Sequence, residues 1–88
     1  MTNHASTVTV KYFARLREHL GIDTEQLAIA EQSRVSDVLA TLSRRGGPWQ
    51  ELDSDRPLLV AVNQAMAKTS TTLADGDEVA FFPPVTGG

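Results

Sequence analysis

The C-terminal stretch of the chain constrains its fold more than any other. Residues 75–77 read Asp-Gly-Asp, which is typical of a turn, and residues 78–82 read Glu-Val-Ala-Phe-Phe, which is typical of a strand. Two prolines follow, and proline ends a strand because it cannot donate to a sheet ladder and holds its backbone extended. The pattern predicts a tail over residues 83–88 that projects about 20 Å from the body.

The tail ends in Gly87 and Gly88, which carry no side chain. Only backbone must then fit wherever this end is inserted. We therefore expect the tail to place the α-carboxylate of Gly88 in a narrow site on another protein.

Length and composition predict one small folded domain. The chain has 88 residues, of which 41% are hydrophobic, so disorder is not expected. The formal charge of −3 argues against nucleic acid as the main partner. No apolar run approaches the length of a membrane span, and residues 1–6 lack a leader pattern, so we expect a cytoplasmic protein. The expected boundaries are a disordered extension over 1–6, a domain over 7–82 and the tail over 83–88.

Periodicity predicts two strands, a main helix and then three strands, which is an α+β roll. The helix carries one apolar stripe, and Ser33 is its expected N-cap. Arg44, Arg45 and Gly46 then end it, and the arginine pair is assigned to the helix end rather than to a phosphate. The expected strands are 7–13, 24–29, 58–63, 67–72 (a short edge strand) and 78–82; a helical turn over 14–21 ends at Gly21, the stripe is Val35, Val38, Leu39 and Leu42, and Trp49, Leu52 and Leu73 are expected in the core.

The usual catalytic constellations are missing from the sequence. His4 and His19 have no convincing acid or hydroxyl partner, and the acidic residues 51, 53 and 55 match no metal-ligand spacing. The reactive group that remains is the carboxylate of Gly88. A carboxylate is a poor electrophile until it is esterified, for example to AMP. The chain has no cysteine and therefore offers no side-chain thiol.

Residues 75–88, Asp-Gly-Asp-Glu-Val-Ala-Phe-Phe-Pro-Pro-Val-Thr-Gly-Gly, resemble the C-terminal signature of the MoaD family, the sulfur-carrying small subunits of molybdopterin synthase. Residues 13–21 resemble the family's Phe-Ala-x-x-Arg-Glu-x-x-Gly segment. The resemblance implies a ubiquitin-like β-grasp, with a mixed sheet of about five strands, one helix packed across it, and the first and last strands parallel at its centre.

The resemblance also implies the chemistry. An E1-like adenylyltransferase uses ATP to adenylate Gly88, and a persulfide donor then converts it to a thiocarboxylate. The tail enters the large synthase subunit and gives sulfur to cyclic pyranopterin monophosphate, building the dithiolene of molybdopterin. Two small and two large subunits form the complex. The small subunit is not catalytic alone, and it binds no cofactor stably.

The partner-facing residues follow from alternation along the strands. Val8, Val10 and Tyr12 share a face that excludes Phe13, and Val79 and Phe81 share a face that excludes Phe82. If the first and last strands are neighbours, Phe13 and Phe82 meet outside, at the base of the tail. The family pattern adds Met66, and Arg17 is expected at the surface or in the interface. The expected site is thus Gly88 as sulfur donor, Pro83, Pro84, Val85, Thr86 and Gly87 for tail insertion, and Phe13, Arg17, Met66 and Phe82 for the partner.

Three alternatives remain open from the sequence. One is a sulfur carrier for thiamine or transfer-RNA thiolation, although the double proline favours molybdopterin. Another is a ubiquitin-like modifier that is conjugated through Gly88 to lysines of other proteins. The third is a plain binding module, for which the loss of Gly88 would have no effect.

Overall fold

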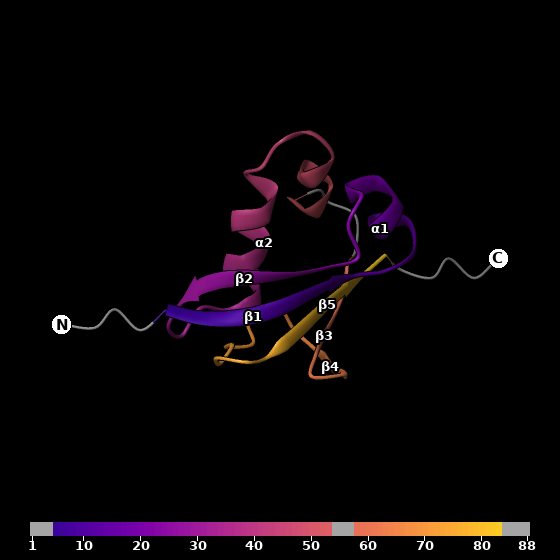
Figure 1. Ribbon diagram of the computed structural model, residues 1–88. Helices are drawn as coiled ribbons and strands as arrows, with labels where there is room; N and C mark the ends of the chain where they lie inside the picture. The colour runs from indigo at the N-terminus through magenta and orange to yellow at the C-terminus, as the bar shows by residue number, and fades with distance from the viewer. Residues whose placement is uncertain (1–4, 54–57, 84–88) are drawn as a thin grey trace.

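The fold is a five-stranded mixed sheet with a helix laid across one face (Figure 1). This computed structural model describes residues 5–53 and 58–83. The elements along the chain are β1 (Ala5–Tyr12), α1 (Ala14–Leu20), β2 (Thr24–Ala30), α2 (Val35–Ser43), a 3₁₀-helix η1 (Gly47–Asp53), β3 (Leu59–Val62), β4 (Ala65–Ala67) and β5 (Glu78–Phe82).

The first and last strands lie together at the centre of the sheet. The strand order is β2-β1-β5-β3-β4, with β1 parallel to β5 and both outer hairpins antiparallel. This order confirms the predicted β-grasp. Its consequence is that β5, the strand leading into the tail, has a hydrogen-bonded neighbour on each side and cannot shift alone.

The hydrophobic core lies between the sheet and α2. The predicted inward residues of β1 and β5 are fully buried, and so are Val35, Val38 and Leu42 of the predicted helix stripe. Leu39 is only half-buried, at the margin of the same core. The fully buried residues of the two central strands are Val8, Val10, Tyr12, Val79 and Phe81, and Leu52 and Leu73 are buried as predicted, while Trp49 packs against the core from η1.

Ser33 is not the N-cap of α2, as the sequence had suggested. Its hydroxyl donates to the carbonyl of Ala30 (2.7 Å), so it stabilises the turn after β2 instead. The cap residue is Arg34, whose backbone N–H donates to the Asp37 carboxylate (2.8 Å). The carboxylate in the first turn therefore satisfies the free backbone donor and also complements the helix dipole.

Two strands differ from the predictions by two or more residues at one end or both. β1 begins at Ala5, so Ala5 and Ser6 pair with β2 rather than belonging to an extension. The edge strand β4 is Ala65–Ala67 rather than 67–72, because Asn63 and Gln64 form a two-residue turn with φ of 51° and 69°. This left-handed pair returns the chain at once, as in a tight hairpin.

Part of the predicted organisation lies outside the described residues. Of the predicted tail, the structure describes Pro83, while residues 84–88 fall outside it, as do residues 1–4 of the predicted extension. Within residues 5–53 and 58–83, no helix has the length and apolar character needed to cross a membrane.

Candidate functional site

The candidate site is the root of the C-terminal tail, where β5 runs into Pro83. On the inner side of β5, Phe81 is 0% exposed. Its carbonyl accepts a hydrogen bond from the N–H of Phe13 (3.2 Å), just beyond the end of β1. The base of the tail is thus held by packing on one face and by a neighbouring strand, so the position at which the tail leaves the domain is well defined.

Phe13 and Phe82 meet on the outer face, as the alternation predicts. Their ring centroids lie 5.5 Å apart with an interplanar angle of 80°, an edge-to-face pair. Phe13 is 45% exposed, and Phe82 is half-buried. Leu59 of β3 lies directly opposite Phe82 in the sheet and is also half-buried. An apolar cluster therefore stands beside the point where the tail begins.

Met66, the third predicted contact, extends this cluster across the sheet. It is 65% exposed on β4 and lies opposite Ala61 of β3, which in turn lies opposite Ala80 of β5. Both alanines are buried among larger neighbours. We name the outer-face set the tail-root patch: Phe13, Leu59, Ala61, Met66, Ala80 and Phe82.

Sequence reasoning missed Leu59 and Ala61, and it placed Ala80 on the same side as Phe82 without naming it as part of the site. Val60 points into the core, so alternation places its neighbours Leu59 and Ala61 on the outer face. The sequence carries this signal, but it identifies patch residues only when the pairing of β3 with β5 is known. An exposed apolar patch on a small domain commonly marks a protein interface. The patch ends at an ion pair between Lys11 and Glu78 (3.3 Å).

Arg17 lies on α1, the short helix that follows Phe13. It is exposed on α1, next to the buried Leu16, and with Gly21, Ile22 and Asp23 it lines a shallow hollow. The structure therefore places the predicted Arg17 on the surface, and its place in a partner interface stays a prediction.

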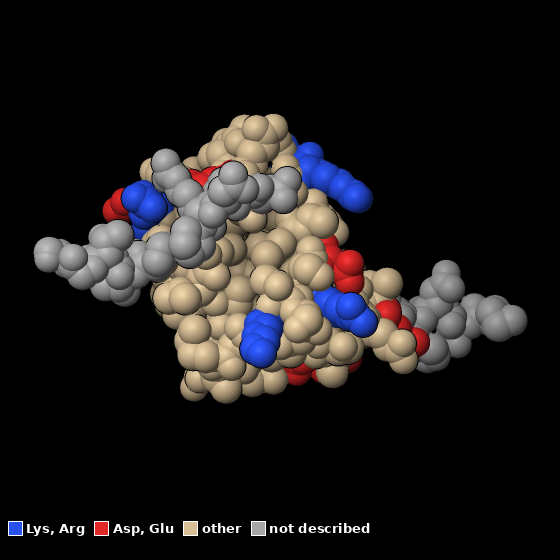
Figure 2. Space-filling model, turned by 180° about the vertical axis from the view of Figure 1, so that it is seen from behind, with Lys and Arg blue, Asp and Glu red and all other residues tan. Residues whose placement is uncertain are grey.

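The side of the molecule seen from behind carries few charges. Uncharged surface fills most of this view, and the acidic side chains lie toward its margins (Figure 2). A protein that met this side would need to remove few charged groups from water, which lowers the cost of burying it.

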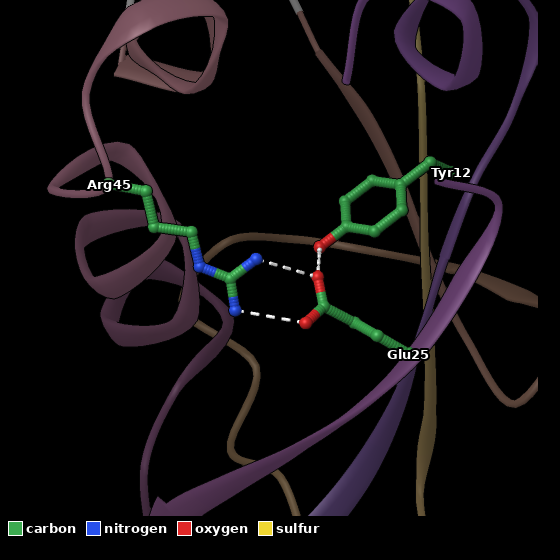
Figure 3. A network of polar contacts seen from close by, with 3 residues as sticks. All are labelled: Tyr12, Glu25 and Arg45. Carbon is green, nitrogen blue, oxygen red and sulfur yellow. Dashed lines mark hydrogen bonds and ion pairs between the residues drawn. The ribbon is translucent and has the colours of Figure 1, made fainter. Parts of the chain in front are cut away.

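The inner side of the tail root is closed by a polar network (Figure 3). The Tyr12 hydroxyl donates to Glu25 (2.7 Å), and Arg45 donates to both oxygens of the same carboxylate (2.9 Å each). The Arg45 guanidinium also lies 4.4 Å from the centre of the Trp49 ring. Four separate elements, β1, β2, η1 and the end of α2, are joined at this point.

The network shifts the protonation of its members. Hydrogen bonds from Arg45 hold the pKa of Glu25 below its ordinary value, and the Tyr12 hydroxyl adds to this effect. Burial raises the pKa of Tyr12 well above its ordinary value, and Glu25 reinforces that shift. The assignment of Arg45 to the helix end alone was wrong. Its side chain bridges to β2, 20 positions earlier in the sequence.

One further side-chain contact connects the two short helices. His19 of α1 contacts Glu51 of η1 (2.8 Å), which fixes two short helices to each other. Over residues 5–53 and 58–83, no three His, Cys, Asp or Glu side chains gather so as to hold a metal ion. Gly88, Gly87, Thr86, Val85 and Pro84 lie beyond the described residues, so their predicted roles stay predictions.

The ThiS family model matches residues 10–88, nearly the whole chain, including the tail. The chain belongs to the ThiS family. This ThiS-family protein is 41% identical to the molybdopterin synthase sulfur carrier subunit of Escherichia coli, over 92% of its own length and 99% of the relative's.

Solved structures agree with this assignment. A putative molybdopterin converting factor subunit 1 from Pyrococcus furiosus is similar with a TM-score of 0.76 and 31% identity, over 91% of this chain and 99% of the other. The small archaeal modifier protein 1 of H. volcanii is similar with a TM-score of 0.76 and 30% identity, over 91% and 99%. These neighbours share the β-grasp with this ThiS-family protein.

Proposed function

We propose that this chain is the sulfur carrier subunit of a molybdopterin synthase. Gly88 is its sulfur-bearing residue, and the chain donates this sulfur to cyclic pyranopterin monophosphate to form the molybdopterin dithiolene. The working complex contains two small and two large subunits, and the domain contributes a positioned tail rather than catalytic side chains.

The observation that carries the proposal is the arrangement at the tail root. β5 is the central strand of the sheet, and it delivers the chain to Pro83 beside the exposed Phe13–Phe82 pair. A rigid base next to an apolar surface is what a reactive end needs in order to enter a partner's site in one orientation. The match to the ThiS family model extends over this same segment.

The chemistry needs activation because the leaving group of a carboxylate would be oxide. In the proposed sequence, a Gly88 carboxylate oxygen attacks the α-phosphorus of ATP on an E1-like adenylyltransferase, and pyrophosphate leaves. The terminal sulfur of a persulfide donor then attacks the acyl carbon and expels AMP, which gives an acyl disulfide. A second thiol of the donor system attacks the donor's own sulfur in this bond and forms a disulfide with it, and the thiocarboxylate is released. ATP is thus used by the partner, and the sulfur is carried covalently.

The adenylyltransferase and the large synthase subunit must both bind the base of the same tail. We therefore assign the tail-root patch to the adenylyltransferase and to the large synthase subunit in turn, with Phe82, Phe13 and Met66 as the main contacts. Residues 83–87 would pass through a channel shaped for backbone, and Arg17 would lie at the rim of the interface.

The test is a reconstituted sulfur-transfer assay with altered tails. Deleting Gly88, or adding one residue after it, should abolish transfer and leave thermal unfolding nearly unchanged. Gly87→Ala should slow adenylation or transfer, because a methyl group does not fit a channel shaped for backbone. The matched control adds one residue before Met1 and should transfer normally. A chain without Gly88 that still yields molybdopterin would refute the carrier function.

A second candidate is a ubiquitin-like modifier. It is favoured by the similarity to the H. volcanii small archaeal modifier protein 1. Both functions begin with the same adenylation of Gly88, so adenylation alone does not distinguish them. A modifier is recovered from its host in isopeptide adducts on lysines of other proteins. A carrier for thiamine or transfer-RNA thiolation would form the thiocarboxylate but fail to convert cyclic pyranopterin monophosphate.

A further inference from the structure

The two edges of the sheet are built differently. β4 forms one edge with only three residues, and so short a strand offers little to pair with. β2 forms the other edge with seven residues, Thr24–Ala30. In the described part of the chain, β2 pairs with β1 and with no other strand (Figure 1).

The pairing of β2 with β1 shows which of its backbone groups are free to pair. The N–H of Tyr12 donates to the carbonyl of Asp23 (2.9 Å), so these opposed residues form a hydrogen-bonded pair. Along an antiparallel ladder, opposed residues alternate between pairs that are hydrogen-bonded to each other and pairs that are not. Glu25 and Leu27 therefore bond to β1, while Gln26 and Ala28 direct their N–H and C=O groups away from the sheet.

The exposed edge of β2 lacks the usual protection against pairing. Residues 24–30 contain no proline and no lysine. The side chains on its outer face are exposed and uncharged; they are those of Thr24, Gln26, Ala28 and Ala30. Its one charged residue, Glu25, faces the helix side and is already paired with Arg45. Leu27 and Ile29 are partly buried at the same margin of the core.

We propose that β2 pairs in antiparallel fashion with β2 of a second copy of this chain, joining two sheets into one. In the register centred on Leu27, Leu27 lies opposite its own counterpart and Gln26 lies opposite Ala28. The same register places Glu25 opposite Ile29 and Thr24 opposite Ala30.

A second copy fits this edge because the strand is its own complement. Within residues 24–30, no charge meets a like charge across the twofold axis, and the partly exposed Leu27 and Ile29 of each copy are covered by those of the other. The pairing ends at Thr24 and Ala30, because the next residues, Asp23 and Glu31, are both acidic and would lie opposite each other. The tail-root patch stays free, because most of it lies on β3, β4 and β5, across the sheet from β2. Since the axis reverses strand direction, the two β5 strands end on opposite sides of the dimer.

The test is sedimentation equilibrium over a wide range of protein concentration. The wild-type chain should show a weak monomer–dimer equilibrium. Gln26→Lys with Ala28→Lys places two like-charged pairs directly across the axis, and the dimer should weaken by about tenfold or more. The matched control, Gln26→Lys with Ala28→Glu, places opposite charges across the same axis and should dimerise at least as well as the wild type.

Hydrogen exchange provides an independent readout for residues on the edge. The amides of Gln26 and Ala28 should gain protection as concentration rises, while that of Leu27, already bonded to β1, should not change. A wild-type chain that stays monomeric at all concentrations would overturn the proposal. So would equal dimerisation of the two charge variants, or protection at Gln26 and Ala28 that does not depend on concentration. These outcomes are independent of sulfur transfer, which neither variant touches.

Discussion

Phe81 and Phe82 are adjacent in the sequence and chemically identical, yet the sheet gives them opposite surroundings. Phe81 is fully buried against the core, whereas Phe82 is half-buried and packs only at the outer face with Phe13. Alternation along a strand produces this split, since successive side chains point to opposite faces. One phenylalanine therefore stabilises the domain, and the other is available to a partner.

The two faces around them differ in the same way. On the inner face, the Tyr12–Glu25–Arg45 network satisfies its polar groups within the chain. On the outer face, the tail-root patch leaves apolar surface in contact with water. Surface left uncovered in this way usually marks a binding site. The comparison indicates that stability and recognition at the tail root can be changed separately.

Removing the inner phenylalanine should have the largest effect. Phe81→Ala leaves a cavity in the core and should lower the free energy of unfolding by about 3–5 kcal/mol. Folded domains have only about 5–15 kcal/mol in total, and a domain as small as this one is expected near the lower end, so this variant should lose a large part of its stability. Denaturant unfolding measures the loss, and Phe82→Ala is the matched control. Equal losses of stability in the two variants would contradict the claim that only the inner phenylalanine stabilises the domain.

Removing the outer phenylalanine should act on binding instead. Phe82→Ala should weaken binding to the large subunit and to the adenylyltransferase by about 2 kcal/mol each, because both partners would hold the same tail base. Calorimetry with each partner gives the two affinities, and thermal unfolding should change little. A large loss of stability with unchanged affinities would place Phe82 in the core and contradict the observed facing.

A smaller effect is expected from the charge within the inner network. Glu25→Gln removes the negative charge and replaces one of the two acceptor oxygens with an NH₂ donor, so Arg45 and Tyr12 can no longer all be satisfied, and it should cost about 1–2 kcal/mol at neutral pH. Because the folded state lowers the pKa of Glu25, the wild-type contribution is present above the ordinary carboxyl pKa and is lost as pH falls through the lowered value.

The acid dependence therefore separates charge from packing. Unfolding measured from neutral to acid pH should show a shallower loss of stability in Glu25→Gln than in the wild type. An unchanged acid limb in the variant would mean that Glu25 contributes through packing alone.

The smallest effect is expected for Tyr12→Phe, which removes one hydrogen bond and keeps the ring. It should cost about 1 kcal/mol. Folding raises the pKa of Tyr12, so its contribution is complete below about pH 10 and is lost as pH rises beyond that. The chain has one tyrosine, so tyrosinate absorbance reports this group alone. If Tyr12 titrated in the folded protein near its ordinary pKa, its hydroxyl would not be buried against Glu25, and the network would not close the inner face.

Much of the fold could be predicted from the sequence because its signals are local. The alternation in residues 8–12 and 78–82 identified which side chains are buried, and the stripe at Val35, Val38 and Leu42 identified the inner face of α2. The Phe13–Phe82 pair was also predicted, but only once the resemblance placed the first and last strands side by side.

The features that were missed depend on distant contacts or on competing local bonds. No local pattern links Arg45 to Glu25, because the helix end and β2 meet only after the chain has folded. Ser33 is a common N-cap residue, yet its hydroxyl binds the preceding turn. The edge strand was placed too late because the tight turn at Asn63 and Gln64 pairs the chain immediately.

The most direct test of the central claim is the intact mass of the protein purified from its own host. If the chain is a sulfur carrier, part of the population should differ from the unmodified mass by one exchange of oxygen for sulfur. Fragmentation should then place this exchange on Gly88. A population that shows no exchange, and is instead recovered linked through Gly88 to lysines of other proteins, would contradict the carrier function.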